Sequence, residues 1–276
     1  MDPATLPPDF PLRFIQFTKL VHQDAYPSVD PAKPELSLAG RVAIITGASR
    51  ALVPAVARAG AKGVVLVAMN AEKLRAVEET VHKINPNVQT LAVPTDISDQ
   101  GSVITLFKLV EGKFGHADIL IHNAAVALDR SPVDIRDADP SIWWRHFEIN
   151  TKGTFLVALS FLKSLPPDAH ANIVHQNAYS SSKLAVQKLI NDIATGYPNV
   201  TTISVHPGSV ETAMVLDAWK RFKFDMLELV GAKFLHGRII SANWDVDELI
   251  VRKDEIVENN LLTIALTGKF GPEQFE

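Results

Sequence analysis

The chain has 276 residues, of which 47% are hydrophobic, so it can bury a large core. Its formal net charge of −4 gives no reason to expect nucleic acid or an anionic membrane as a partner. It contains no cysteine, which excludes disulfides and thiolate chemistry, and its 9 histidines lack ligand-like spacing, so we predict no metal site. No apolar run reaches the ~18 residues of a membrane span. The N-terminus lacks a basic region followed by an apolar stretch, so we expect a cytoplasmic protein without membrane contact.

Residues 1–40 differ in composition from the rest of the chain. Seven of the 17 prolines lie there, and proline disfavours long regular elements. Leu12 to Leu20 is expected to form a short helix or a packed arm. We therefore predict a proline-rich N-terminal arm over residues 1–40, followed by one folded domain over residues 41–276.

After Gly40, short apolar runs alternate with helical patterns. The runs are Val42–Thr46, Val64–Ala68, Val88–Val93, Ile119–Ile121, Ile173–Val174 and Thr201–Val205. Continuous apolar runs are typical of strands that are buried on both faces. Strands that alternate with helices form right-handed crossovers of a parallel sheet. The pattern predicts an α/β fold with a doubly wound parallel sheet of about seven strands in a single domain.

Three helices between these runs have clear signals. One of them begins at Asp139, an N-cap residue, with Pro140 at the first helical position, and it runs through Phe155. The other two each carry one apolar face, formed by Leu74, Val77, Val81 and Ile84 on the first and by Val103, Leu106, Phe107 and Val110 on the second.

Tyr179 and Lys183 lie one turn apart at the start of an amphipathic helix, so their side chains share a face. A nearby ammonium favours the phenolate and lowers the pKa of a tyrosine. A tyrosine tuned in this way can give or take a proton near neutral pH, as general acid–base catalysis requires. Helices also carry such pairs on solvated faces by chance, so the pair alone leaves a structural role open.

Polar and glycine residues mark the ends of the predicted strands. Gly47 follows the first strand, and a glycine turn between a strand and a helix is where a dinucleotide pyrophosphate binds. In chain order these motifs are Thr46-Gly47-Ala48-Ser49-Arg50, Asp96-Ile97, His122-Asn123-Ala124-Ala125, Asn150, Tyr179, Lys183 and Pro207-Gly208-Ser209-Val210-Glu211-Thr212. This ordered set resembles the short-chain dehydrogenase/reductase family over residues 38–270. The N-terminal arm and the tail from Ser241 to Glu248 also look like those of fungal members that act in secondary metabolism or on small carbonyl compounds.

The resemblance implies a Rossmann-like domain with an oxidoreductase site. It implies that Tyr179 is the catalytic proton donor. Lys183 would lower the pKa of Tyr179 and hold the nicotinamide ribose, and Asn150 would position the water of a proton relay. The implied cofactor-binding residues are Gly47, Ser49, Arg50 and Leu52 in the first turn, Asp96 and Ile97 beside the adenine, Asn123, Ala124 and Ala125 along the adenosine ribose, Tyr179 and Lys183, and Pro207, Gly208, Val210 and Thr212 at the carboxamide. Asp96 could instead cap the following turn, and Asn123 and Asn150 could be satisfied structural groups.

The end of the second strand bears on which cofactor is bound. Met69 and Asn70 stand there, and neither is acidic, whereas Arg50 lies in the first turn. An acidic residue at this place would bind the 2′-hydroxyl of NAD and repel a 2′-phosphate. We therefore predict NADP(H) rather than NAD(H).

The chain departs from the family pattern at three places. Ala51 and Val53 replace the second and third glycines of the loop, and Val53 is expected to clash or to push the helix outward. The helix that follows is about one turn shorter than usual. The segment between the fifth strand and Tyr179 lacks the catalytic serine, and loss of such a donor costs about 10²–10³ in rate.

Three interpretations of the function stay open. The leading one is an NADP(H)-dependent oxidoreductase that reduces a carbonyl group or oxidises an alcohol of a small molecule. The alternatives are a catalytically impaired relative kept for binding or assembly, and an incorrectly joined gene model of an ordinary reductase. The resemblance also implies a homodimer or homotetramer, paired through the helices that start near Asp139 and Ala178. The apolar residues expected at this pairing surface are Leu156, Val157, Leu159, Leu184, Val186 and Leu189.

Overall fold

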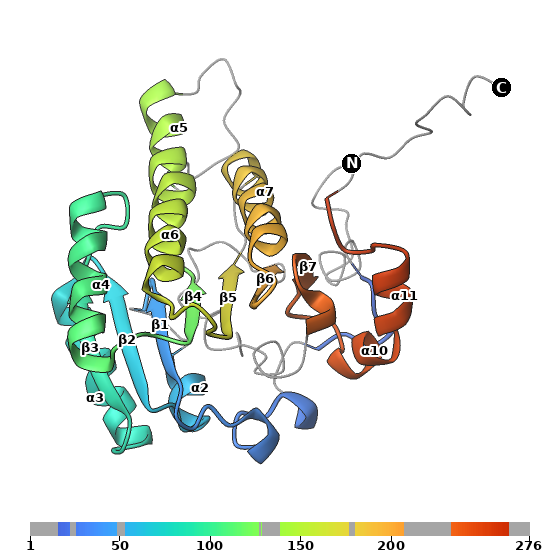
Figure 1. Ribbon diagram of the computed structural model, residues 1–276, viewed down its shortest axis with the longest axis horizontal. Coiled ribbons are helices and arrows are strands. Elements are labelled where there is room, and N and C mark those ends of the chain that lie inside the picture. The colour runs from blue at the N-terminus through green and yellow to red at the C-terminus, as the bar shows by residue number, and fades with distance from the viewer. Residues whose placement is uncertain are drawn as a thin grey trace, which may run out of the picture.

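The computed structural model describes residues 16–22, 26–48, 53–126, 128, 139–176, 180–206 and 233–264. At its centre lies a 7-stranded sheet in the order β3-β2-β1-β4-β5-β6-β7, and every pairing is parallel (Figure 1). The predicted doubly wound parallel sheet is confirmed. The strands are β1 (Val42–Thr46), β2 (Gly63–Ala68), β3 (Gln89–Pro94), β4 (Ile119–His122), β5 (Ala171–Gln176), β6 (Val200–His206) and β7 (Arg238–Ser241).

Six strands coincide with the predicted apolar runs because both faces of the sheet are buried. In β1, for example, Ala43 and Ile45 belong to one core cluster, whereas Val42 and Ile44 belong to the other. The strand that the sequence does not reveal is β7. It has only 4 residues and begins with a buried arginine, Arg238, so it lacks the continuous apolar run of a doubly buried strand.

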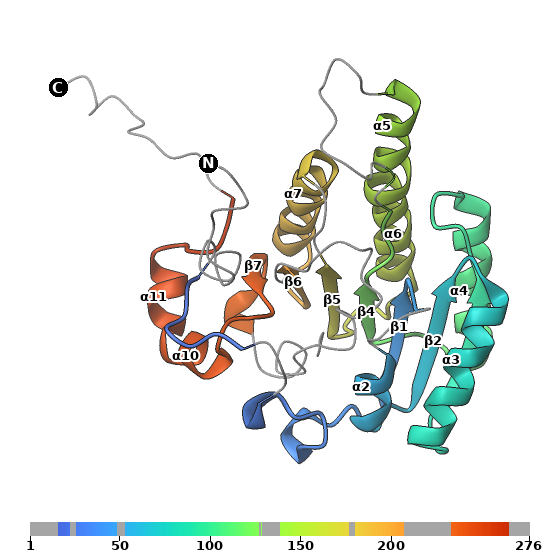
Figure 2. The same cartoon turned by 180° about the vertical axis from the view of Figure 1, so that it is seen from behind.

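Helices cover both faces of the sheet (Figures 1 and 2). Residues of α2 (Val53–Arg58), α3 (Ala71–Ile84), α10 (Val246–Val251) and α11 (Lys253–Glu258) lie in one core cluster. Residues of α4 (Gln100–Phe114), α6 (Thr154–Ser164) and α7 (Ser180–Gly196) lie in the other. The apolar faces predicted for α3 and α4 both pack into these clusters.

Three consecutive helical segments between β4 and β5 form one continuous helix, which we call the helical rod, and Asp139 precedes it as the predicted N-cap. The rod consists of α5 (Pro140–His146), the π-helical segment η5 (Phe147–Gly153) and α6. The Asp139 carboxylate accepts hydrogen bonds from the N–H groups of Ser141 at 2.7 Å and Ile142 at 3.4 Å, so the predicted N-cap is confirmed. The first part of the rod, α5, extends beyond the carboxyl ends of the strands and buries none of its residues (Figure 1).

The apolar residues expected at a pairing surface mostly face the core. Leu156, Val157 and Val186 are buried in the cluster shared by α4, α6 and α7, and Leu189 packs against it. The expectation that these residues point outward is wrong, because they form the stripe that faces the sheet. The outward apolar side chains on α6 and α7 include Phe155, which is 45% exposed, and Leu184, which is 60% exposed.

The described part of the N-terminal arm contains no α-helix, and it packs closely on the rest of the domain. Its regular structure is limited to two 3-10 turns that begin at prolines, η2 (Pro27–Val29) and η3 (Pro34–Leu36). Leu36 and Leu38 are buried together with Val53 and Val56 of the short helix α2. The Leu38 N–H donates to the Ala59 carbonyl at 2.8 Å, so this segment is also tied to the end of α2.

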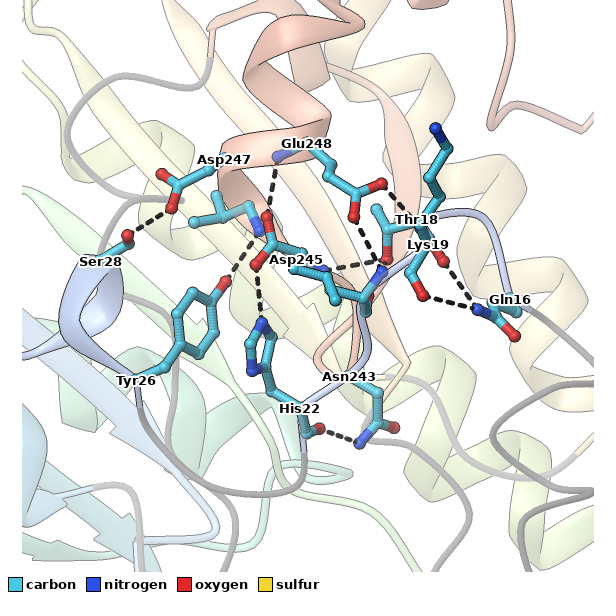
Figure 3. A network of polar contacts seen from close by, with 12 residues as sticks. Gln16, Thr18, Lys19, His22, Tyr26, Ser28, Asn243, Asp245, Asp247 and Glu248 are labelled. Carbon is cyan, nitrogen blue, oxygen red and sulfur yellow. Dashed lines mark hydrogen bonds and ion pairs between the residues drawn. The ribbon is translucent and has the colours of Figure 1, made fainter.

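Residues 16–22 lie across the loop before α10 and form what we call the N-terminal strap. Val21 pairs with Trp244 in an antiparallel bridge. The His22 N–H donates to the Asn243 carbonyl at 2.8 Å, and the Asn243 amide donates back to the His22 carbonyl at 2.8 Å. These contacts join two segments that are more than 200 residues apart in sequence, and Figure 3 shows the bond from the Asn243 side chain.

Two carboxylates at the start of α10, those of Asp245 and Glu248, also bind the strap (Figure 3). Asp245 caps α10 by accepting from the Glu248 N–H at 2.9 Å, and its second oxygen lies 2.7 Å from His22 Nε2. Glu248 accepts from the N–H groups of Lys19 at 2.7 Å and Leu20 at 2.8 Å. Burial raises the pKa of the Asp245 carboxyl, but the hydrogen bonds from His22 and the Glu248 N–H outweigh burial and lower the pKa below its usual value.

Candidate functional site

The glycine turn after β1 meets the end of β4, its neighbour in the sheet. Gly47 has φ +66°, a left-handed conformation that favours glycine. A Cβ at this position would lie 2.8 Å from Asn123 Nδ2 and 3.1 Å from Ala124 Cα, so a side chain would not fit. The Asn123 amide donates to the Gly47 carbonyl at 3.3 Å. The structure therefore brings Gly47, Asn123 and Ala124 together, and their contact with a cofactor stays a prediction.

Thr46, which is not among the predicted site residues, holds the two strand ends together. Its hydroxyl oxygen accepts hydrogen bonds from the N–H groups of Asn123 at 3.1 Å and Ala124 at 3.0 Å. The signal that could have found it is its place as the last residue of β1, directly before Gly47. The sheet order also changes direction at this point, because β2 and β3 lie on one side of β1 while β4 and β5 continue on the other.

Asn150 is fully buried in the π-helical segment η5, and its side-chain amide is engaged by the protein itself. Its oxygen accepts from the Val126 N–H at 2.8 Å, and its nitrogen donates to the Val126 carbonyl at 2.9 Å. The same nitrogen lies 3.5 Å from Ser182 Oγ. The side-chain amide of Asn150 is thus satisfied within the protein, as the alternative for this residue expects, and a relay water at Asn150 stays a prediction. Short π-helical segments nevertheless occur frequently at functional sites.

The first turn of α7 is joined to the same segment. The Thr151 hydroxyl donates to the Ser182 carbonyl at 3.0 Å, and Ser182 is the residue directly before Lys183. Lys183 belongs to α7, which begins at Ser180, so the expected catalytic helix starts beside Asn150. Tyr179 and the side chain of Lys183 lie outside the described residues. The strand β5 ends at Gln176, so only three residues separate it from α7.

Asp96 and Ile97 follow β3 as predicted, and both side chains have partners within the protein. The Asp96 carboxylate accepts from the Ser98 N–H at 2.9 Å and from the Ser98 hydroxyl at 2.7 Å, so Asp96 caps the turn, as its alternative role requires. Ile97 is 6% exposed, and a Cβ added to Gly153 would lie 3.0 Å from it. Gly153 therefore allows the π-helical segment to approach the end of β3.

The second strand ends without a carboxylate, as the sequence shows. Met69 is 72% exposed, and Asn70 caps α3 by accepting from the Lys73 N–H at 2.9 Å. The short helix α2 has 6 residues and begins at Val53, which is fully buried. The shortening of this helix relative to the family pattern and the clash of Val53 with a cofactor both stay predictions.

Several expected site residues fall outside the part of the chain that the structure describes. They are Ser49, Arg50 and Leu52 of the first turn, Tyr179, and Pro207, Gly208, Val210 and Thr212 after β6. Within the described ranges, no group of three or more His, Cys, Asp or Glu residues could hold a metal ion. No described helix is both long and apolar enough to cross a membrane.

Comparisons with known proteins agree with this arrangement. A sequence model described as short chain dehydrogenase matches residues 41–221. A short chain dehydrogenase of Monascus purpureus is 30% identical over 89% of this chain and 94% of that protein. A versicolorin reductase of Emericella nidulans is 28% identical over 67% of this chain and 75% of that protein. The structure of L-sorbose reductase from Gluconobacter frateurii, complexed with NADPH and L-sorbose, is 20% identical and has a TM-score of 0.60 over 75% of this chain and 96% of that chain, which shows a shared fold.

Proposed function

Because this chain belongs to the short chain dehydrogenase family, a family of oxidoreductases, we propose that it moves hydride between NADP(H) and a small carbonyl compound or alcohol. The observation that carries the proposal is the meeting of the Gly47 turn with Asn123 and Ala124 where the sheet order changes direction. In open α/β sheets, ligands bind at the carboxyl ends of the strands at such a switch point. The versicolorin reductase relative supports a substrate from secondary metabolism.

The end of β2 supports NADP(H) as the cofactor. The position where an acidic residue would repel a 2′-phosphate holds Met69, which is exposed, and Asn70, whose side-chain oxygen caps α3. Arg50, in the first turn, supplies the positive charge that attracts the phosphate. Ala51 and Val53 stand where the family has glycines, and this favours weak binding, because those glycines let the backbone approach the pyrophosphate and let helix and strand pack closely.

In the proposed reaction, NADPH supplies the hydride when it is bound, and the chain supplies the proton. Tyr179 donates a proton to the carbonyl oxygen, so that a carbonyl compound, a hydride and a proton give an alcohol. The Lys183 ammonium stabilises the phenolate that remains. Asn150 holds the π-helical segment against the first turn of α7 through its contact with Ser182. Without the family's serine, Tyr179 is the only proposed donor to the substrate oxygen, so we expect slow turnover.

The test combines calorimetry with a rate measurement. We expect NADPH to bind weakly and NADH more weakly still, and we expect carbonyl-dependent oxidation of NADPH in the presence of small ketones and aldehydes. Tighter binding of NADH than of NADPH would contradict the cofactor assignment. If neither dinucleotide binds, the proposed function fails.

A second candidate function is a catalytically impaired binding protein of the same family. The observation in its favour is the short connection between Gln176, the last residue of β5, and Ser180, the first residue of α7, which leaves no serine between them. Binding of NADPH without oxidation by any carbonyl compound would support this function over the first one.

A further inference from the structure

A buried histidine at the end of β4 lies between two threonines and has no role in the function proposed above. His122 is 2% exposed. Its Nδ1 lies 3.1 Å from the hydroxyl oxygen of Thr46 on β1, and its Nε2 lies 3.0 Å from the hydroxyl oxygen of Thr154 at the start of α6. The imidazole therefore bridges the strand that carries the glycine turn and the helical rod that carries Asn150.

The contacts of Thr154 determine which of the two ring nitrogens donates to it. The Thr154 hydroxyl lies 2.5 Å from the backbone carbonyl oxygen of Asn150. A carbonyl oxygen can only accept a hydrogen bond, so Thr154 must donate its single proton to Asn150. Thr154 can then only accept from His122. Nε2 of His122 consequently carries a proton.

The contacts of Thr46 lead to the same tautomer independently. Its hydroxyl oxygen already accepts from the N–H groups of Asn123 and Ala124. A hydroxyl has two acceptor sites and one proton, so the third contact, to His122, must be one in which Thr46 donates. Nδ1 of His122 therefore accepts and carries no proton. Both ends of the chain of hydrogen bonds assign the neutral imidazole with its proton on Nε2.

We propose that His122 is a positioning residue, which orients the Asn150 carbonyl and the π-helical segment through a one-way chain of hydrogen bonds. The chain runs from Thr46 to Nδ1 of His122, and from Nε2 through Thr154 to the Asn150 carbonyl. This chain of hydrogen bonds fixes the position of the Gly47 turn relative to the helical rod, and that rod contacts the start of α7. The consequence for turnover rests on the proposed function, whereas the tautomer and the hydrogen bond to Asn150 do not.

The tautomer can be measured by NMR on the apoprotein. Two-dimensional ¹H–¹⁵N spectra that detect long-range couplings distinguish the two neutral imidazole tautomers and the imidazolium. We expect His122 to show the neutral form with the proton on Nε2 at neutral pH. Its signals are identified by their loss in His122→Gln, or by assignment of the wild-type chain if that variant does not fold. A proton on Nδ1, alone or together with one on Nε2, would overturn the proposal.

A matched set of threonine variants tests what the chain of hydrogen bonds does. Thr154→Val removes the hydroxyl at constant shape, and Thr154→Ser retains it. Thr202→Val is the control, because Thr202 is fully buried in β6 and its hydroxyl has no hydrogen-bond partner among the described residues. We expect the carbonyl ¹³C resonance of Asn150 to shift in Thr154→Val only. Equal shifts in the Val and Ser variants at position 154, or none in either, would overturn the proposal.

Kinetics add a readout that a general loss of stability would not produce. If the chain oxidises NADPH, Thr154→Val should lower kcat by about 10- to 100-fold, because small misplacements remote from the reacting atoms have effects of this size. The dissociation constant of NADPH should stay unchanged. Parallel losses in Thr154→Ser would contradict the positioning role. If no carbonyl compound is reduced, the proposed function fails, and the two NMR measurements still decide the present proposal.

Discussion

Single side chains carry the proposed chemistry, and Tyr179 is the most direct to test. Tyr179→Phe should remove carbonyl-dependent NADPH oxidation, because phenylalanine has no proton to give. Lys183→Ala should move the high-pH decline of the rate to higher pH, because the ammonium lowers the pKa of the phenol that must stay protonated. The matched control is Tyr197→Phe, which changes a tyrosine that is 46% exposed. Equal rates for Tyr179→Phe and the wild type would show that another group is the acid.

Asn150 allows a second test at this scale. Asn150→Asp keeps the shape but removes the amide donor to the Val126 carbonyl, and it leaves a carboxyl group in a fully buried place. We expect a loss of about 1–3 kcal/mol in the free energy of unfolding, measured with urea at neutral pH. Asn87→Asp adds the same charge at an exposed position and should change this free energy little. A similar loss in both variants would mean that charge, rather than the buried contact, is responsible.

At the scale of elements, the contact between the N-terminal strap and α10 makes a testable contribution to stability. Asp245→Ala removes both the cap of α10 and the partner of His22. Loss of a cap alone costs about 1 kcal/mol, so the expected loss is larger than that. Asp139→Ala is the matched control, because Asp139 caps α5 from an exposed position. Equal losses of unfolding free energy in the two variants would show that the contact between Asp245 and His22 adds nothing.

The stabilisation by Asp245 should also depend on pH in a defined direction. Its pKa is lower in the folded chain than its usual value. Such a carboxyl stabilises the fold above its unfolded pKa of about 3.9, and the contribution is lost as the pH falls through the folded value. The difference in unfolding free energy between wild type and Asp245→Ala should therefore be constant near neutral pH and shrink in acid. A difference that grows in acid would contradict this assignment.

At the scale of the whole molecule, the outward apolar residues predict self-association. Phe155 and Leu184 are 45% and 60% exposed on α6 and α7, and the resemblance implies pairing through these helices. We expect a dimer or tetramer in sedimentation equilibrium at micromolar concentration, and a shift toward monomer in Phe155→Asp. Leu109→Asp is the control, since Leu109 is 46% exposed on α4. A wild-type chain that is monomeric under these conditions would contradict the prediction.

Much of the fold and part of the candidate site could be predicted because they depend on local patterns. The run Val42–Thr46 is buried on both faces, so its composition alone marks a central strand. Asp139 with Pro140 marks a helix start for a similar reason, since a cap acts within its own turn. Gly47 is required by a close approach of the backbone, which a glycine at the end of a strand signals.

By itself, then, the sequence determined the parallel sheet, its flanking helices and the family motifs at the strand ends. Only the tertiary structure decided which partners distant residues meet. The strap is paired with α10 through His22 and Asp245, which are 223 residues apart, and no local periodicity encodes such a pairing. The bridge from Thr46 through His122 to Thr154 is likewise invisible in the sequence. The physical reason is that hydrogen bonds depend on which faces meet in space, whereas composition and spacing report only the environment of each element.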